Sequence, residues 1–160
     1  MHLCDCSNFI DYFKNAGKTV SCAESCTGGL IGSCITSVPG ASSVFMGGVI
    51  AYSNSVKTGL LGVPPSELEE NGAVSIPVAK SMALGVVKIT GSDYSVAVTG
   101  IAGPGGAVLG KPVGTVCIGV SDGSRVLAST FHFSGNRDDI RNRTVNEALS
   151  MLIEFAEGRL

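Results

Sequence analysis

Short apolar segments rich in β-branched residues alternate with segments of helical periodicity along most of the chain. Segments 19–23, 45–52 and 94–98 are predicted strands. The helices predicted between and around them cover 8–16, 27–37, 55–61, 65–70 and 75–89. Because strands that alternate with helices pair in parallel, the pattern favours an α/β fold.

The last third of the chain departs from this alternation. Two further β segments, 113–120 and 126–133, flank Asp122 and Gly123, a pair typical of a tight hairpin. A long helix is predicted over 136–157. We therefore expect a three-layer α/β/α sandwich with a mixed, largely parallel sheet.

Size and charge point to one soluble domain. The chain has 160 residues, of which 44% are apolar and 15% charged, with a net charge of −2. This length suits a single domain over 1–160 that needs no metal or disulfide for stability. The low charge indicates much surface buried inside the domain or against another subunit. The slightly negative balance argues against nucleic acid and membranes as partners.

The cysteines indicate a reduced, cytoplasmic protein. No pair has CxxC spacing, and His2 and His132 lie far apart, so no metal site is expected. The six cysteines are Cys4, Cys6, Cys22, Cys26, Cys34 and Cys117, and several lie in apolar segments. Metal binding or oxidation of Cys4 and Cys6 is the alternative. Asp5, Asp11 and Lys14 interrupt any signal-peptide core, and no apolar segment is long enough to span a membrane.

The first candidate site is the turn AESCTGG at 23–29, which follows a predicted strand and opens a helix. A serine in such a turn can attack a carbonyl while backbone N–H groups at the helix start hold the oxyanion. Ser25 is the candidate nucleophile, and Gly28 and Gly29 would let a substrate approach the backbone. The alternative is that Ser25 or Thr27 only caps the helix. Cys26 is a second possible nucleophile, without a histidine near it in sequence.

A second strand-to-helix turn, YSNSVK at 52–57, carries a lysine. If Asn54 caps the helix, Lys57 lies in its first turn, where the helix dipole disfavours an ammonium. Burial would lower its pKa further, and a neutral lysine can act as general base for a serine. An ordinary surface lysine, with Tyr52 in the core, is the commoner alternative.

A glycine-rich loop over 100–112 follows the predicted strand 94–98. Loops at strand ends commonly bind ligands in α/β sheets, and glycine N–H groups can hold a phosphate or a carboxamide. The sequence matches neither the Walker A nor the dinucleotide-binding pattern. A flexible loop without function is the alternative.

Two arginines lie at the start of the last helix. Arg137 and Arg141 are four residues apart, so they share one helix face and can clamp a phosphate. The alternative is that these arginines pair with Asp138 or Asp139 on a solvated face.

Together, these segments resemble the CinA C-terminal-domain family, which includes nicotinamide mononucleotide deamidases. The matching stretches are AESCTGG at 23–29, GGVIAYSNSVKTGLLGV at 47–63, NGAVS at 71–75, TGIAGPGG at 99–106, KPVGTV at 111–116 and GNRDDIR at 135–141. Many members carry an N-terminal nucleotide-pyrophosphatase-like domain, which we expect this chain to lack. The resemblance implies the three-layer α/β/α fold, often as a homo-oligomer.

The resemblance also implies an activity, hydrolysis of nicotinamide mononucleotide to nicotinate mononucleotide and ammonia in pyridine nucleotide salvage, without metal or cofactor. The implied catalytic residues are Ser25, Lys57 and Tyr52. The implied substrate-binding residues are Thr27, Gly28, Gly29, Asn54, Thr99, Gly100, Ala102, Gly103, Gly105, Arg137 and Arg141. The alternative is a non-catalytic nucleotide-binding or competence-related interaction module, since the family includes members named for competence.

Overall fold

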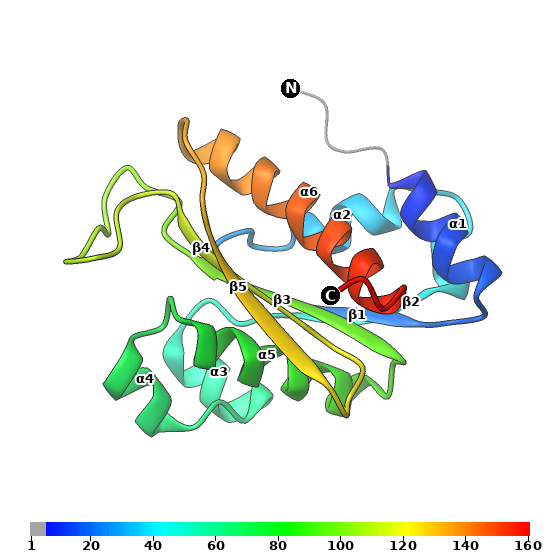
Figure 1. Ribbon diagram of the computed structural model, residues 1–160, viewed down its shortest axis with the longest axis horizontal. Helices are drawn as coiled ribbons and strands as arrows, with labels where there is room; N and C mark the ends of the chain where they lie inside the picture. Colours follow the sequence, from blue (N-terminus) through cyan, green and yellow to red (C-terminus); the bar gives the residue numbers. More distant parts are fainter. Residues whose placement is uncertain (1–5) are drawn as a thin grey trace.

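A computed structural model describes residues 6–160. Its centre is a five-stranded sheet in the order β2-β1-β3-β4-β5 (Figure 1). The strands are β1 (Val20–Glu24), β2 (Phe45–Ile50), β3 (Tyr94–Gly100), β4 (Thr115–Ser121) and β5 (Val126–His132). β1 pairs in parallel with β2 and β3, whereas β4 is antiparallel to β3 and β5. Only β4 therefore runs against the other strands, which confirms the mixed, largely parallel sheet.

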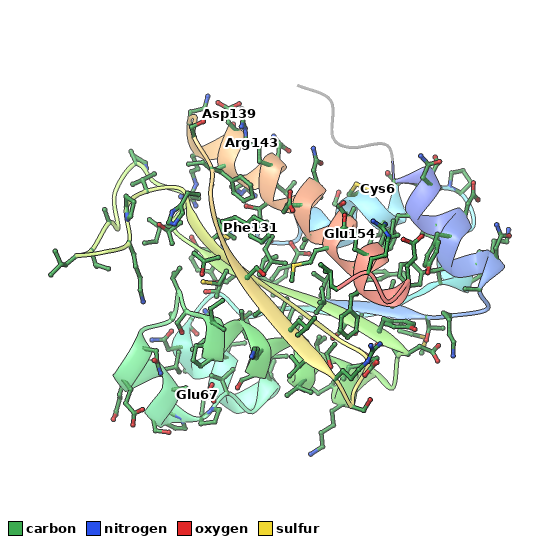
Figure 2. All side chains as sticks on the ribbon, in the orientation of Figure 1. Cys6, Glu67, Phe131, Asp139, Arg143 and Glu154 are labelled. Carbon is green, nitrogen blue, oxygen red and sulfur yellow. A yellow bond between two sulfur atoms is a disulfide. The ribbon has the colours of Figure 1, made fainter. Side chains whose placement is uncertain are left out.

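Helices cover both faces of the sheet (Figure 1). One layer holds α1 (Ser7–Asn15), α2 (Leu30–Thr36) and α6 (Arg137–Ala156), and the other holds α3 (Asn54–Leu61), α4 (Pro65–Asn71) and α5 (Ile76–Thr90). In Figure 2, Glu67 lies in the second layer, across the sheet from Cys6 and Glu154 in the first. The predicted three-layer sandwich is confirmed. No helix described between residues 6 and 160 has the length and hydropathy to cross a bilayer.

The central strands separate two apolar cores. Val96 and Val98 of β3 pack with the α1, α2 and α6 layer, whereas Ala97 between them packs with α5. β1 is buried along its whole length. Burial on both faces holds the carboxyl end of β1 in place, and the chain leaves the sheet there into the first predicted site.

Two predicted helix starts were wrong, that of α2 by three residues and that of α3 by one. α2 begins at Leu30 rather than at residue 27, because Gly28 and Gly29 adopt left-handed conformations with φ of 59° and 102°. Residues 25–29 therefore form a turn. The cap of α3 is Ser53, whose hydroxyl accepts a hydrogen bond from the Val56 N–H, and Asn54 is the first helical residue.

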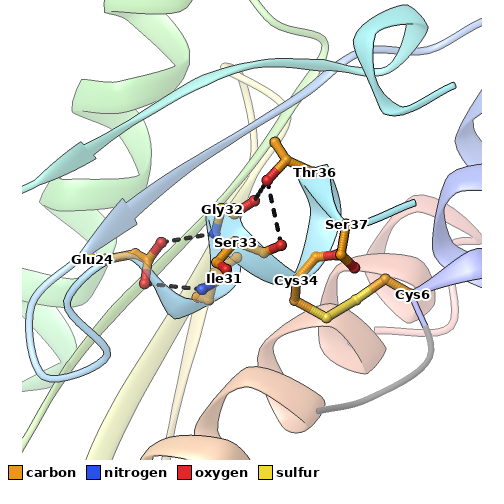
Figure 3. Close-up of a disulfide and its surroundings, with 8 residues drawn as sticks. All are labelled: Cys6, Glu24, Ile31, Gly32, Ser33, Cys34, Thr36 and Ser37. Atoms are coloured by element: carbon orange, nitrogen blue, oxygen red, sulfur yellow. Dashed lines mark hydrogen bonds between the residues drawn. A yellow bond between two sulfur atoms is a disulfide. The ribbon is translucent and has the colours of Figure 1, made fainter. Parts of the chain in front are cut away.

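A disulfide joins Cys6 to Cys34 and links the start of α1 to α2 (Figure 3). The expectation that all thiols are reduced was therefore wrong. Cysteine connectivity depends on tertiary proximity, which spacing alone does not reveal. Cys22, Cys26 and Cys117 are free thiols. Cys4, for which metal binding or oxidation was the alternative, and His2 lie outside the described residues.

We expect the Cys6→Ser, Cys34→Ser double variant to be less stable than the wild type by about 3 kcal/mol. A bond that closes a loop across a separation of 28 residues restricts the unfolded chain by about this amount. Urea unfolding with and without a reductant measures it. The reductant should lower the urea midpoint of the wild type only. A wild-type urea midpoint that does not change with the reductant would show that the bond adds no stability.

Candidate active site

Ser25 lies at the carboxyl end of β1, between two parallel neighbours. Its N–H donates to the Val98 carbonyl of β3 at 3.1 Å. The carbonyl of the preceding Glu24 accepts from the N–H of Ala51, just beyond β2, at 2.7 Å. The chain leaves β1 towards one helical layer and leaves β2 towards the other. Ligands of α/β proteins bind at such a divergence of connections.

Lys57 reaches this point from α3 and is only 2% exposed. Its Nζ lies 3.1 Å from Ser25 Oγ. Nζ also donates to the carbonyls of Ala51, at 2.9 Å, and Tyr52, at 3.3 Å. Removal of the amine from water lowers the pKa of Lys57, and the nearby Cys26 opposes this shift.

The three contacts of Lys57 match the bonding capacity of a neutral amine. Its two N–H groups can donate to the two carbonyls, and its lone pair can then accept the Ser25 hydroxyl proton. In the ammonium form, all three contacts are donated by Nζ. Proton transfer between Ser25 and Lys57 therefore needs no movement of either side chain.

The turn after Ser25 provides candidate oxyanion donors. Within residues 6–160, no oxygen accepts a hydrogen bond from the N–H of Cys26 or of Thr27. The Gly28 N–H, in contrast, donates to the Ser25 carbonyl at 3.1 Å. The available donor is thus the N–H of Cys26, which lines the cavity above Ser25, because Gly28 is bonded and Thr27 is fully buried away from it. Unbonded backbone N–H groups beside a nucleophile can stabilise a developing oxyanion.

A cavity of about 320 Å³ opens above Ser25. This volume is in the range of small-molecule sites. The predicted residues that line it are Ser25, Tyr52, Asn54, Lys57, Thr99, Gly100, Ala102, Gly103, Gly105 and Arg137. The other lining residues are Cys26, Ala73, Val74, Ile101 and Gly106. The structure therefore brings segments from five parts of the sequence to one place.

Ala73 and Val74 were missed by the sequence reasoning. They belong to the connection between α4 and α5, and Thr99 holds them in place because its hydroxyl donates to the Ala73 carbonyl at 2.8 Å. The match of segment 71–75 to the family pattern was the one signal in the sequence that pointed to them.

Tyr52 and Arg137 form the outer wall of the cavity. The Tyr52 side chain is 63% exposed, and its hydroxyl accepts from Arg137 Nη2 at 3.4 Å. Arg137 Nη1 donates to the Gly103 carbonyl at 2.7 Å. Only the carbonyl of Tyr52 contacts Lys57. Among residues 6–160, the Tyr52 side chain makes no hydrogen bond to Ser25 or Lys57, so its catalytic role stays a prediction.

Four predicted binding residues do not line the cavity: Thr27, Gly28, Gly29 and Arg141. Thr27 is fully buried. Arg141 donates to the carbonyls of Cys26, at 3.2 Å, and Thr27, at 2.9 Å, and pairs with Asp138 at 3.6 Å. Its guanidinium is thus engaged by the turn after Ser25. The two arginines therefore have different roles. Arg137 lies one helical turn nearer the cavity and lines it, whereas Arg141 does not.

Cys26 lines the cavity but is a poor nucleophile. Burial raises the pKa of its thiol to about 12. At neutral pH, the sulfur is therefore protonated, and the thiolate is the reactive form. The protonated thiol of Cys26 and the contact between Lys57 Nζ and Ser25 Oγ both favour Ser25 as the nucleophile.

Comparison with known proteins places this arrangement in a family. The model of the CinA C-terminal domain matches residues 6–156. The chain belongs to the CinA C-terminal domain family. It is 54% identical over 138 residues to a CinA-like protein of Thermosynechococcus vestitus, which covers 84% of this chain and 33% of that protein. A CinA-like protein of Mycobacterium marinum is 50% identical over 139 residues, covering 86% of this chain and 32% of the relative.

Solved structures of the CinA superfamily share the fold. A competence/damage inducible protein from Agrobacterium tumefaciens has a TM-score of 0.88 and 42% identity, over 91% of this chain and 90% of that one. A CinA superfamily protein from Klebsiella pneumoniae has a TM-score of 0.91 and 26% identity, over 94% and 95%. The chain spans about a third of the length of the curated relatives above, but nearly all of these solved chains.

Proposed function

We propose that the domain is an amidase in which Ser25 is the nucleophile and Lys57 the general base. The observation that carries this proposal is the 3.1 Å contact between Lys57 Nζ and Ser25 Oγ, made by a lysine that burial favours in its neutral form. A surface lysine would stay protonated at neutral pH and could not activate a serine.

The reaction divides into two acyl transfers. Lys57 takes the Ser25 proton as Oγ bonds to the carboxamide carbon, and the N–H group of Cys26 stabilises the oxyanion. The carbon–nitrogen bond then breaks, and Lys57 returns the proton to the nitrogen, which leaves as ammonia. Water next attacks the acyl carbon and gives its proton to Lys57. The acid product departs, and the proton returns to Ser25.

We propose nicotinamide mononucleotide as the substrate, as the resemblance to deamidases implies. The aromatic ring of Tyr52 offers a face for the pyridine or ribose at the cavity rim. Arg137 and the glycine loop supply donors for the phosphate. Within residues 6–160, no oxygen accepts from the N–H groups of Gly103, Gly105 or Gly106.

Ammonia release tests the proposal directly. Purified protein should convert nicotinamide mononucleotide to nicotinate mononucleotide and one equivalent of ammonia. Tight binding of the mononucleotide without ammonia release would favour the alternative, a non-catalytic nucleotide-binding module. The homo-oligomer and the cytoplasmic location stay predictions, the first of which light scattering in solution tests.

We expect Arg137→Ala to raise KM for nicotinamide mononucleotide by about tenfold or more, because it removes a charge-assisted hydrogen bond to the phosphate. KM for the riboside, which has no phosphate, should change little. Arg143→Ala is the matched control, since Arg143 lies on the same helix, is exposed and does not line the cavity. Equal effects of Arg137→Ala on the two substrates would show that Arg137 does not bind the phosphate.

A further inference from the structure

Glu24, the residue before Ser25, is a buried glutamate that binds the far end of the turn. It is 1% exposed. Its Oε2 accepts from the N–H groups of Gly29, at 3.0 Å, and Ile31, at 3.1 Å, and its Oε1 accepts from Gly32 at 2.9 Å. Figure 3 shows Glu24 at the start of α2, bonded to Ile31 and Gly32. The carboxyl group thus ties the last residue of β1 to the first turn of α2.

Arg141 holds the middle of the same turn from α6. Its Nε and Nη2 donate to the carbonyls of Cys26 and Thr27, which lie 115 and 114 residues away in the sequence. A guanidinium holds two neighbouring carbonyls with two nitrogens fixed in one plane, whereas a lysine has a single nitrogen on a flexible stem. Glu24 therefore binds N–H groups at the end of the turn and in α2, and Arg141 binds two carbonyls of the turn.

Peptide planarity connects these contacts to the candidate oxyanion donors. In a trans peptide unit, the C=O and the N–H point in opposite directions. The Thr27 carbonyl that binds Arg141 belongs to the same peptide unit as the Gly28 N–H, which donates to the Ser25 carbonyl. The Ser25 carbonyl in turn belongs to the same unit as the Cys26 N–H. Arg141 thus orients the Cys26 N–H through these two peptide units.

We propose that Glu24 and Arg141 are positioning residues that hold the turn after Ser25 so that the N–H of Cys26 stays available to the oxyanion. Neither side chain lines the cavity in which the substrate is proposed to bind. The inference rests on the proposed function for its substrate, but its test also uses a probe that needs no amidase substrate.

The test compares Arg141→Lys and Glu24→Gln with Asp138→Asn. Lysine has one nitrogen in place of the two, Nε and Nη2, that hold the carbonyls, and glutamine places an amide donor against backbone donors. Asp138, with its side chain 78% exposed, contacts Arg141 only through an ion pair at 3.6 Å, so Asp138→Asn is the matched control. The readouts are kcat and KM for nicotinamide mononucleotide. A third readout is the rate at which a small alkyl fluorophosphonate modifies Ser25, measured by intact mass across pH.

We expect Arg141→Lys to lower kcat and the fluorophosphonate rate by on the order of 10- to 100-fold, as small displacements of oxyanion donors do. KM should stay within about threefold, because ground-state contacts are intact. The pH midpoint of Ser25 modification should not move, since Lys57 is untouched. A merely destabilised protein would instead lose rate in proportion to its unfolded fraction. Asp138→Asn should behave as wild type.

The outcomes separate this inference from the proposed function. Wild-type rates in folded Arg141→Lys protein would overturn the inference, whether or not Glu24→Gln folds. If wild-type Ser25 reacts with the fluorophosphonate but nicotinamide mononucleotide is not hydrolysed, the substrate proposal is wrong and the labelling rates alone decide the inference. If Ser25 neither reacts nor turns over substrate, both are wrong.

Discussion

Replacement of Ser25 by alanine should lower the turnover of nicotinamide mononucleotide by at least about 10⁴-fold, because the acyl-enzyme can no longer form. The residue is 8% exposed, and the substitution removes one oxygen from a cavity wall that fourteen other residues still form. The fold and the affinity for the mononucleotide should therefore persist. Turnover by a continuous ammonia assay and binding by calorimetry measure the two effects separately.

Cys26→Ala is the matched control for this variant. It removes the neighbouring nucleophilic atom, whose thiol is protonated at neutral pH because burial raises its pKa to about 12. Its turnover should stay within about tenfold of the wild type, the scale of a small packing change near a site. An inactive Cys26→Ala protein beside an active Ser25→Ala protein would reverse the assignment of the nucleophile.

The pairing of Ser25 with Lys57 could be predicted because it depends on local patterns and one rule of topology. Both residues follow predicted strands, and the carboxyl ends of neighbouring parallel strands meet at one edge of a sheet. Once β1 and β2 pair in parallel, the two turns must meet. Because the cap is Ser53 rather than Asn54, Lys57 lies one position further into the helix than predicted, which leaves this conclusion unchanged.

The role of Arg141 could not be predicted in the same way. Its spacing from Arg137 shows that both lie on one face of α6, but the cavity covers only part of that face. Which carbonyls Arg141 meets depends on how α6 packs beside α2, which is a property of the assembled core. The disulfide could not be predicted for the same reason, because Cys6 and Cys34 meet only when α1 packs beside α2.

Lys57 should control the pH dependence of the reaction. Only the neutral amine can accept the Ser25 proton, so kcat/KM should rise about tenfold per pH unit below the pKa of Lys57 and level off above it. Burial lowers this pKa, so the plateau should begin at a lower pH than an exposed lysine would allow. Lys57→Arg should lose activity by at least about 10³-fold at every pH, since a guanidinium stays protonated.

Lys57→Met distinguishes the base from a purely structural lysine. Methionine keeps most of the apolar stem but leaves the carbonyls of Ala51 and Tyr52 without their donor, at a cost of about 1–3 kcal/mol each if water does not replace it. Thermal melts of both variants therefore accompany the pH–rate profiles. Arginine can still donate to these carbonyls, so a structural lysine would be replaced better by arginine than by methionine. Near wild-type turnover in Lys57→Arg would thus exclude the base role, whereas two folded and inactive variants beside a rising wild-type profile assign proton transfer to Lys57.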